Sequence, residues 1–280
     1  MAVIGVIGYG FVGAAVVAGF INKQNKVVVA DPKLSKTTQD VLKEQPDVVF
    51  ICVPTPMGAD GVANTSIVET VVQELHDYTG IVVLKSTVVP TVVQRLEKMH
   101  PRFVYNPEFL TEANAVRDFL NPSFHVFGGN GNDTRYLDYL YYNYSNCVPT
   151  DNINFVTAVE AALIKYSVNS FMATKVMFMN QLYDLCNSLG ADYRSVADAM
   201  GDDPRITHSH MMVPGPDGRR AASGPCFGKD IPAIIRESQA LGCELTIIKE
   251  AWNRNCDIRN SYPERLPREI EQHISFNKIV

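Results

Sequence analysis

A glycine-rich turn near the start of the sequence has the spacing that holds a dinucleotide. The run Gly8-Tyr9-Gly10-Phe11-Val12-Gly13 follows a short apolar stretch and precedes a helical pattern. The first glycine permits a tight turn, the second lets the backbone approach a pyrophosphate, and the third allows close packing of the helix on the strand. The helix N-terminus would offer N–H groups and a partial positive charge to the phosphates. We expect a dinucleotide here; the alternative is a turn without a ligand.

An acid at the end of the second apolar run indicates which dinucleotide would bind. Asp31 follows Val27 to Ala30, at the position where a carboxylate receives the ribose hydroxyls and disfavours a 2′-phosphate. NAD is therefore predicted rather than NADP. Lys36 is a weaker candidate for an adenosine contact, since a lysine in such a segment is more often solvated.

The second half of the chain holds a lysine and an asparagine at helical spacing. Lys165 and Asn169 are four residues apart, so their side chains point to the same side of a helix. Leu163, Ile164 and Val168 make this helix otherwise apolar, which weakens the alternative of a solvated lysine.

The cysteines are too dispersed for a disulfide scaffold, and none forms a CxxC pair of the kind that zinc sites use. They are Cys52, Cys147, Cys186, Cys226, Cys243 and Cys256. Reduced thiols in the cytoplasm are expected. No HxxxH or carboxylate cluster indicates a metal either, so no metal is predicted.

The elements that must position these residues alternate in the first half of the chain. Six strands and five helices are expected, which is the pattern of βαβ units and a parallel sheet. The strands are Val3 to Ile7, Val27 to Ala30, Val48 to Val53, Ile81 to Lys85, Phe103 to Tyr105 and His125 to Gly128; the helices are Val12 to Ile21, Thr37 to Lys43, Ser66 to Leu75, Thr91 to Met99 and Arg135 to Tyr144. Near-continuous runs of Val, Ile and Phe predict an α/β fold, a doubly wound Rossmann-type sheet with helices on both faces.

A helical segment is expected after the sheet. Residues Asn154 to Leu189 contain neither Pro nor Gly and predict one long central helix. Shorter helices follow, interrupted by a loop from Pro204 to Pro225, and the tail from Tyr262 is expected to be peripheral. We thus predict a dinucleotide-binding domain over 1–148 and an all-helical domain over 149–280.

Composition excludes several classes of protein. The 280 residues are 46% hydrophobic, enough for a real core, and carry a net charge of −5. No apolar run reaches the ~18 residues that a membrane-spanning helix needs, and the N-terminus lacks the basic region of a secretory signal. No stripe of Lys and Arg indicates nucleic acid. A cytoplasmic protein without membrane or nucleic-acid partners is expected.

Several motifs in one order resemble the UDP-glucose/GDP-mannose 6-dehydrogenase family over roughly residues 3 to 250. They are Cys52-Val53-Pro54-Thr55-Pro56, Lys85-Ser86-Thr87-Val88-Val89-Pro90, Asn106-Pro107-Glu108-Phe109-Leu110 with Glu112, Glu160-Ala161-Ala162-Leu163-Ile164-Lys165-Tyr166 with Asn169, Asp203-Pro204-Arg205-Ile206, and Cys226-Phe227-Gly228-Lys229-Asp230. The resemblance implies oxidation of a nucleotide-sugar C6 alcohol to a carboxylate in two NAD-dependent steps, of the UDP-glucose to UDP-glucuronate type.

The resemblance also implies residue roles. Cys226 matches the nucleophile that traps the aldehyde, because a thiohemiacetal can be oxidised to a thioester and hydrolysed. Lys165 and Asn169 match the groups that stabilise the oxyanion, Thr87 and Asp230 those that orient water. Glu108 matches a carboxylate at the sugar carbon. The implied cofactor contacts beyond the glycine turn are Val53, Pro54, Thr55, Ser86 and Glu112, and the implied substrate contacts are Phe109, Leu110, Lys165, Asn169 and Arg205.

The sequence departs from the family pattern near the nucleophile and at its end. Ala222-Ser223-Gly224-Pro225 replaces the glycine-rich approach to Cys226, and Gly228 replaces a proline. The chain stops at Val280, before the second Rossmann-like domain of the family, so a short form without the nucleotide-sugar-binding domain is expected. Arg219 and Arg220, in the lengthened run before Cys226, could partly replace the missing phosphate contacts; the alternative is a solvated basic loop.

Two other functions stay open. A two-electron β-hydroxyacid dehydrogenase has a similar architecture and also carries Lys-x-x-x-Asn on a long helix, but it needs no thiol. A catalytically silent NAD-binding or assembly module is the other. In each case the apolar helix of residues 154–189 predicts a homodimer, since a monomer would expose a large nonpolar face. Arg205 matches an arginine that reaches the neighbouring subunit's substrate in family dimers. The nucleotide and the sugar are not specified.

Overall fold

The computed structural model describes residues 1–58 and 60–280. The chain forms two compact units, each described by itself. The first contains Met1–Thr55 and Asn64–Lys165, and the second contains Pro56–Ala63 and Tyr166–Val280. The sheet unit thus extends past residue 148, where we predicted the domain boundary, because one more strand and the start of the long helix belong to it.

The first unit is built on one sheet. Among the described residues, seven strands lie in the order β2-β1-β3-β4-β5-β6-β7. Their bounds are β1 (Ala2–Ile7), β2 (Asn25–Ala30), β3 (Val48–Ile51), β4 (Ile81–Leu84), β5 (Phe103–Tyr105), β6 (His125–Gly129) and β7 (Ile153–Val156). The register pairs Val6 with Phe50 and Phe50 with Val83. The central strands are buried on both faces, as their unbroken apolar sequences predicted.

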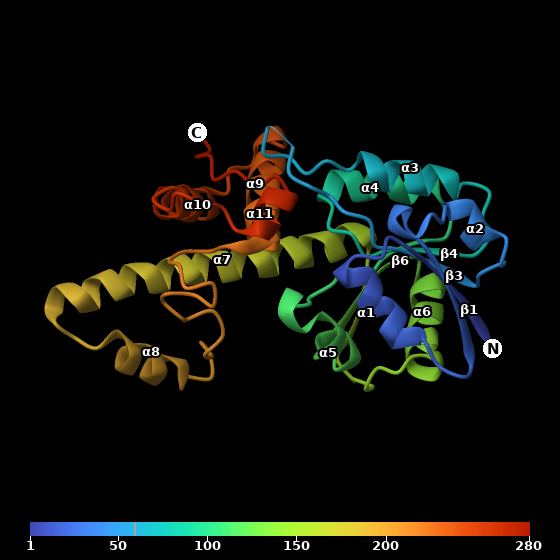
Figure 1. The fold of residues 1–280 in the computed structure, drawn as a ribbon, viewed down its shortest axis with the longest axis horizontal. Helices are drawn as coiled ribbons and strands as arrows, with labels where there is room; N and C mark the ends of the chain where they lie inside the picture. The colour runs from blue at the N-terminus through green and yellow to red at the C-terminus, as the bar shows by residue number, and fades with distance from the viewer. Residues whose placement is uncertain (59) are drawn as a thin grey trace. The chain divides into compact units, whose positions relative to one another are not determined.

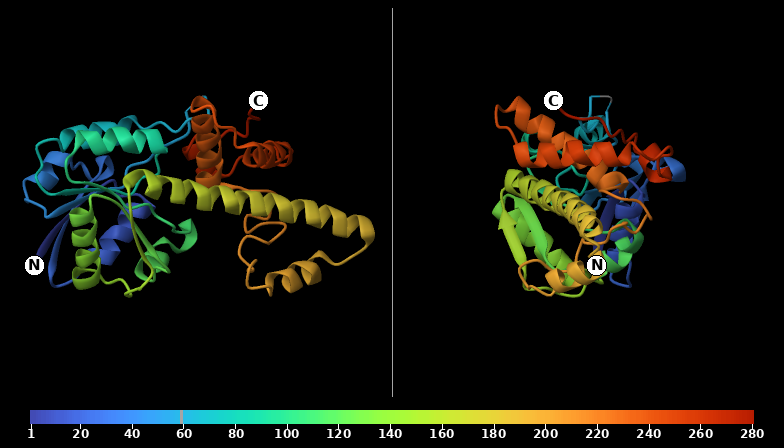
Figure 2. Two further views of the ribbon diagram at one scale, coloured as in Figure 1. Left: turned by 180° about the vertical axis from the view of Figure 1, so that it is seen from behind. Right: turned by 90° about the vertical axis from the view of Figure 1, so that its left-hand side faces the viewer.

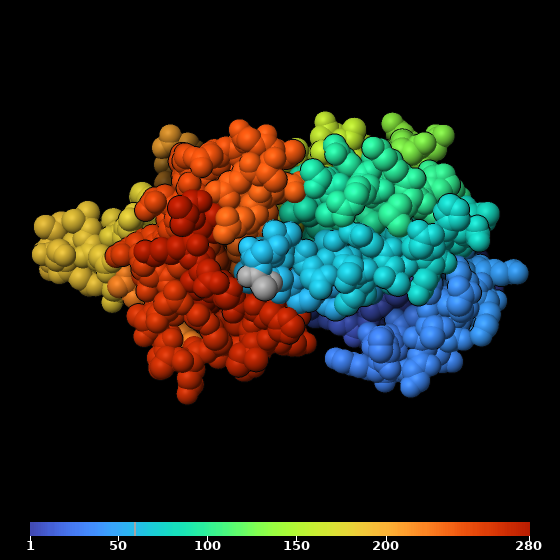
Figure 3. Space-filling view, turned by 90° about the horizontal axis from the view of Figure 1, so that it is seen from above, coloured from blue at the N-terminus to red at the C-terminus, as the bar shows by residue number. Residues whose placement is uncertain are grey.

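Helices cover both faces of this sheet (Figures 1 and 2). One face carries α1 (Phe11–Phe20), α5 (Ala115–Leu120) and α6 (Gly131–Tyr144); the other carries α2 (Thr38–Leu42), α3 (Ser66–Glu74) and α4 (Pro90–Met99). Figure 3 shows α3 and α4 lying side by side. Short 3₁₀ turns at Pro32–Leu34 and Glu112–Asn114 complete the unit. The predicted Rossmann-type α/β fold is confirmed.

Three local expectations were wrong. β6 runs antiparallel to β5, so the sheet is not wholly parallel. Helix α5 was missed because its six residues are too few for a periodic pattern. The long helix does not begin at Asn154, because Ile153–Val156 pairs with β6 as β7. Thr157 and Glu160 then form reciprocal hydrogen bonds, Thr157 N to Glu160 Oε2 at 2.7 Å and Glu160 N to Thr157 Oγ1 at 3.3 Å, and α7 (Ala158–Leu189) starts there.

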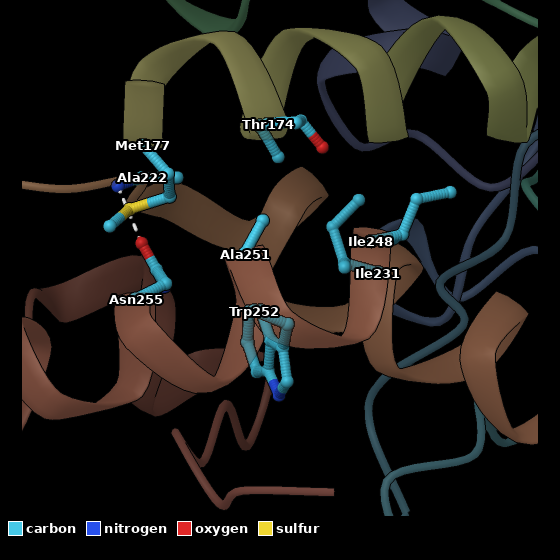
Figure 4. Close-up of a pocket in the computed structure, with 9 residues that line it drawn as sticks. Thr174, Met177, Ala222, Ile231, Ile248, Ala251, Trp252 and Asn255 are labelled. Atoms are coloured by element: carbon cyan, nitrogen blue, oxygen red, sulfur yellow. Dashed lines mark hydrogen bonds between the residues drawn. The ribbon is translucent and has the colours of Figure 1, made fainter. Parts of the chain in front are cut away.

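The second unit is helical. After α7 come α8 (Tyr193–Gly201), α9 (Gly224–Ala240), α10 (Thr246–Arg259) and α11 (Pro267–Glu271), with the expected loop between α8 and α9. Its core includes Ile231 and Ile235 of α9 and Trp252 and Cys256 of α10. A cavity of about 10 Å³ lies within this core, walled mostly by apolar side chains of α7, α9 and α10. Figure 4 shows the residues that line it.

The C-terminal tail is part of this core, so the expectation of a peripheral tail was wrong. Ile274, Phe276 and Ile279 are buried, and the Phe276 ring packs on Trp252 with ring centroids 5.7 Å apart. The backbone N–H of Met57 also donates to the carbonyl of Gln272 at 3.1 Å, and Figure 3 shows this segment beside the tail. The apolar residues between the prolines and charges of the tail account for its burial.

No helix in the described part of the chain is long and apolar enough to cross a membrane.

Candidate active site

The glycine turn has the geometry that its spacing predicted. Gly8 has φ +92°, and a Cβ there would lie 2.7 Å from the Cys52 carbonyl oxygen. A Cβ on Gly13 would lie 1.9 Å from the oxygen of Gly8, so helix and strand pack as closely as only glycine allows. At Gly10 a Cβ would meet nothing within 4 Å, which leaves the backbone open to a ligand. α1 begins at Phe11 with no acid in its first turn.

Asp31 lies beside this turn. Its Oδ2 accepts a hydrogen bond from Tyr9 N at 2.7 Å, and its Oδ1 accepts one from Lys33 N at 2.8 Å. The carboxylate is therefore held next to the glycine backbone at the end of β2, where a ribose would lie. Lys36 is exposed nearby. The open glycine backbone, the uncapped helix start and the acid together fit an NAD-type dinucleotide.

Two motifs meet at the carboxyl ends of β3 and β4. Ser86 Oγ donates to the Val53 carbonyl at 2.7 Å, and Thr55 Oγ1 donates to the Thr87 carbonyl at 3.1 Å. These four residues are buried, whereas Pro54 is exposed. Glu112 is exposed in its 3₁₀ turn. In open α/β sheets ligands bind at the carboxyl ends of strands, so this edge is where the cofactor contacts were expected.

Glu108 and Lys165 form a buried ion pair in the first unit. Lys165 Nζ lies 3.2 Å from Glu108 Oε1, donates to the Glu108 carbonyl at 2.7 Å, and lies 5.4 Å from the Phe109 ring centroid. Glu108 Oε2 accepts from Leu110 N at 2.7 Å. Burial raises the pKa of Glu108, but the charge of Lys165 and the Leu110 N–H outweigh it and hold that pKa below its ordinary value. The pair is a charged cluster shielded from water.

Asn169, Lys229 and Asp230 form a second polar cluster, in the helical unit. Asp230 Oδ2 accepts from Asn169 Nδ2 at 2.7 Å, and Asp230 Oδ1 accepts from Lys229 Nζ at 2.5 Å. Asp230 is buried, and both of its oxygens are held. Lys229 is given no role of its own in the sequence analysis, although it is the chain neighbour of Asp230.

Cys226 is half-buried in the first turn of α9. Asp230 follows it by four residues, which places both on one side of that helix. The N-terminus of this helix carries a partial positive charge, and the Cys226 thiol belongs to its first turn. This arrangement suits a nucleophilic cysteine. None of the six cysteines is in a disulfide.

The altered loop before Cys226 is anchored by buried polar side chains, none of which was given this role in the sequence analysis. Ala221 N donates to Asn180 Oδ1 at 3.1 Å, and Ala222 N to Asn255 Oδ1 at 2.7 Å (Figure 4). Gly224 N donates to Glu269 Oε1 at 3.3 Å. These acceptors come from three different helices, α7, α10 and α11, so no local signal could have found them together.

The three arginines of the predicted substrate set are already engaged within the chain. Arg205, 86% exposed at its side chain, forms a forked pair with Asp203, with Nε at 3.0 Å and Nη2 at 2.6 Å. Arg219 donates to the Glu264 carbonyl at 2.5 Å. Arg220 Nε donates a hydrogen bond to Asn180 Oδ1 at 3.2 Å, and Arg220 Nη1 lies 2.8 Å from Asp184 Oδ1. The donors that Arg219 and Arg220 would offer a phosphate are therefore held by other groups.

Both parts of the chain match models of one family. Residues 32–145 match the NAD binding domain of the UDP-glucose/GDP-mannose dehydrogenase family, and residues 159–257 match its central domain. The chain belongs to this family. No group of three His, Cys, Asp or Glu side chains that could hold a metal ion is found in the described residues of this family member.

Relatives and solved structures agree with this membership. UDP-glucose 6-dehydrogenase of Pseudomonas aeruginosa is 34% identical over 75% of this chain and 48% of its own length. A UDP-glucose dehydrogenase structure from Pyrobaculum islandicum has a TM-score of 0.77 at 27% identity, covering 91% of this chain and 68% of that one. The chain spans about half the length of the curated relatives it matches.

A structure outside this family shares the fold. The 3-hydroxyisobutyrate dehydrogenase of Mycobacterium tuberculosis has a TM-score of 0.69 at 17% identity, covering 90% of this chain and 91% of its own. At that identity the likeness concerns the fold alone, so the residues of the site must distinguish the two chemistries.

Proposed function

We propose that this protein is an NAD-dependent dehydrogenase that oxidises the C6 alcohol of a nucleotide sugar to a carboxylate, as in conversion of UDP-glucose to UDP-glucuronate. The observation that carries the proposal is Cys226 in the first turn of α9, four residues before the buried Asp230. A two-electron dehydrogenase has no use for a thiol in this position. The names of the similar proteins support the same substrate class.

The glycine turn and Asp31 are proposed to hold NAD. The backbone of residues 8–13 and the N-terminus of α1 would receive the pyrophosphate, and Asp31 the ribose hydroxyls. Val53, Thr55 and Ser86, at the ends of β3 and β4, would complete the cofactor contacts. When bound, NAD accepts one hydride in each of the two oxidations.

The first oxidation removes a hydride from C6 to NAD and a proton from the hydroxyl to water, which leaves an aldehyde. Lys165, an ammonium beside Glu108, and Asn169 are proposed to stabilise the charge that develops on this oxygen. Both lie on α7 one turn apart. Lys165 and Asn169 are buried, so water does not screen their electrostatic interactions with the substrate oxygen, which are stronger for that reason.

The second oxidation runs through a covalent bond to Cys226. The thiolate adds to the aldehyde carbon and the oxygen takes a proton, giving a thiohemiacetal. Loss of a second hydride from C6 and of the hydroxyl proton gives a thioester. Water, oriented by Thr87 and Asp230, then adds to the carbonyl carbon; the C–S bond breaks, and carboxylate and thiol are released.

The decisive experiment counts NADH formed per molecule of nucleotide sugar consumed, across a panel of UDP- and GDP-sugars. We expect two NADH per molecule of nucleotide sugar. One NADH per substrate would instead indicate a β-hydroxyacid-type dehydrogenase. If no NADH were formed although NADH still bound, the chain would be a silent NAD-binding module.

Asp31→Asn is expected to weaken NAD binding by about tenfold or more, since hydrogen bonds to a charged acceptor contribute about 1.5 to 3 kcal/mol. The loss of negative charge also removes the repulsion of a 2′-phosphate, so the ratio of NAD to NADP affinity should fall. Fluorescence titration with NADH and NADPH measures both. Asp77→Asn, an exposed acid in the same unit, is the matched control and should change neither. An unchanged ratio in Asp31→Asn would contradict the assignment.

A homodimer is proposed on the exposed apolar stripe of α7. Phe171, Phe178 and Leu185 are 66%, 54% and 55% exposed and repeat every seven residues, which places them on one side of the helix. A second copy of the chain, offering the same stripe, would bury them. Arg205 is proposed to reach the partner copy's substrate. The reduced cysteines support a cytoplasmic location.

Phe171→Lys combined with Phe178→Lys is expected to convert the dimer to a monomer, since two buried charges would oppose association. Sedimentation at micromolar concentration measures this, with the 31.0 kDa chain as the monomer mass. Tyr142→Lys, which changes an exposed aromatic residue on α6, should leave the dimer intact. A wild-type protein that sediments only at 31.0 kDa would refute the proposed dimer.

A further inference from the structure

A cavity of about 180 Å³ in the first unit adjoins the loop that carries Glu108, Phe109 and Leu110. Its walls come from the loop of residues 106–110, the segment of residues 118–126, Lys85 at the end of β4, and Tyr141 of α6. Of the wall residues, Glu108 is implied in catalysis and Phe109 and Leu110 are implied substrate contacts, whereas the other walls have no role in the proposed reaction. The cavity is too small for a nucleotide, since pockets for larger ligands run to about 300 to 1,000 Å³.

The ammonium of Lys85 is the unusual feature of this cavity. The residue is 4% exposed, and Nζ donates to Asn106 Oδ1 at 3.0 Å. That amide is held in place, because Tyr141 OH donates to the same oxygen at 2.9 Å and Asn106 Nδ2 donates to the Val126 carbonyl at 2.9 Å. Among the described residues no carboxylate lies within 4.0 Å of Nζ, so donor positions remain for a ligand. The charge of Glu108 acts on Lys85, but that carboxylate contacts Lys165, so Lys85 has no direct ion-pair partner among the described residues.

The remaining walls define the ligand's shape. The rings of Phe109 and Phe124 lie with centroids 4.6 Å apart, and Phe119 lies 5.5 Å from Lys85 Nζ. Burial and the nearby charge of Lys85 lower the pKa of His125 to about 4, so its imidazole is neutral at pH 7. The cavity therefore pairs one positive charge with an aromatic lining.

Two acids limit the charge of the ligand. Glu108 is paired with Lys165, and Asp118 Oδ2 accepts from the backbone N–H of Thr111 at 2.9 Å. Their pKa values are held below the ordinary range, although burial alone would raise them, so both carboxylates are ionised at neutral pH. A second negative charge on the ligand would meet these carboxylates without a cation to balance it.

We propose that this cavity binds a small monocarboxylate with an apolar or aromatic body, whose carboxylate pairs with the Lys85 ammonium beside Asn106. The site shares Glu108, Phe109 and Leu110 with the implied substrate contacts, but its ligand would be held at Lys85 and does not depend on the proposed reaction.

Binding of para-fluorobenzoate, followed by fluorine NMR on the full chain, tests the proposal. We expect binding at millimolar concentration or below, weakened about tenfold or more by Lys85→Met. Lys98→Met, at an exposed lysine of α4, is the matched control and should bind as the wild type does. Absence of binding to the wild type, or equal binding to Lys85→Met, would overturn the proposal.

Two further probes define the ligand class. Para-fluorobenzylammonium has the same shape with the opposite charge and should not bind. Inorganic phosphate, which lacks the apolar body, should not displace the benzoate. Binding of the cation, or displacement by phosphate at similar concentration, would show that the assigned chemistry is wrong.

The folded state of the variant can be checked independently. Burial lowers the pKa of Lys85 to about 8, so below that pH the folded chain holds a charge that burial disfavours. Methionine has similar length without the charge, and the thermal midpoint of Lys85→Met at pH 7 should equal or exceed that of the wild type. Loss of binding then reports the missing ammonium. A lower midpoint would show that the charge is already compensated within the chain, against the proposal.

The pH dependence gives a final check. The groups that face Lys85 are the thiols of Cys52 and Cys147, the Glu108 carboxylate, the Lys165 ammonium and the His125 imidazole. Burial raises the pKa of Cys52 to about 12 and also raises that of Cys147. Benzoate affinity should fall as pH rises through about 8, when Lys85 loses its proton. Constant affinity from pH 7 to pH 9 would contradict the assignment to Lys85.

Discussion

Cys226→Ser is expected to lower the rate of carboxylate formation on the order of 10³-fold or more, the scale seen when a nucleophile is lost. A serine hydroxyl is not ionised near neutral pH and makes a poor substitute for a thiolate. The first hydride transfer needs no thiol, so the variant should release aldehyde and form at most one NADH per substrate. Product analysis together with NADH counting measures both effects.

The exposed Cys243 provides the control for this substitution. Cys243→Ser makes the same chemical change in the same unit and should leave the rate and the two NADH per substrate unchanged. If Cys226→Ser still formed two NADH per substrate at the wild-type rate, the thioester route would be excluded and the two-electron alternative favoured.

Arg259→Met is expected to destabilise the helical unit by about 3 to 5 kcal/mol, because it breaks a buried ion network by removing one sign of charge. Arg259 is 1% exposed, with Nη1 3.0 Å from Asp217 Oδ2 and Nη2 2.9 Å from Glu269 Oε1. Glu269, itself fully buried, would be left without its cation. Glu269 Oε1 also accepts a hydrogen bond from Gly224 N, so the loop before Cys226 should become more mobile as well.

Thermal unfolding measures the loss of stability. Arg254→Met on the same helix is the control: Arg254 lies 3.7 Å from Asp257 with both side chains largely exposed, and such pairs contribute about 0 to 1 kcal/mol. Equal, small shifts for Arg259→Met and Arg254→Met would show that the buried network does not hold the tail and the loop together.

The sequence by itself determined the parts of this protein that depend on neighbours along the chain. The spacing of Gly8, Gly10 and Gly13 predicted the turn, because the glycine requirement of its backbone is set within six consecutive residues. The apolar runs predicted strands buried on both faces. Family motifs also indicated Cys226 and Asp230, whose separation of four residues predicts one side of a helix.

Only the tertiary structure decided which distant groups meet. The antiparallel direction of β6 and the pairing of β7 depend on contacts with other strands. The periodicity of such short segments contains no information about these contacts. The tail was expected to be peripheral because its prolines and charges dominate its composition; its few apolar residues nevertheless complete a core.

The same physical reason applies to the site. The anchors of the loop before Cys226 are Asn180, Asn255 and Glu269, which come from three separate helices. The cavity beside Lys85 likewise combines residues from β4 to α6. Sequence patterns carry local spacing and burial, whereas a buried hydrogen bond or the surroundings of a buried charge are defined by residues that become neighbours only on folding.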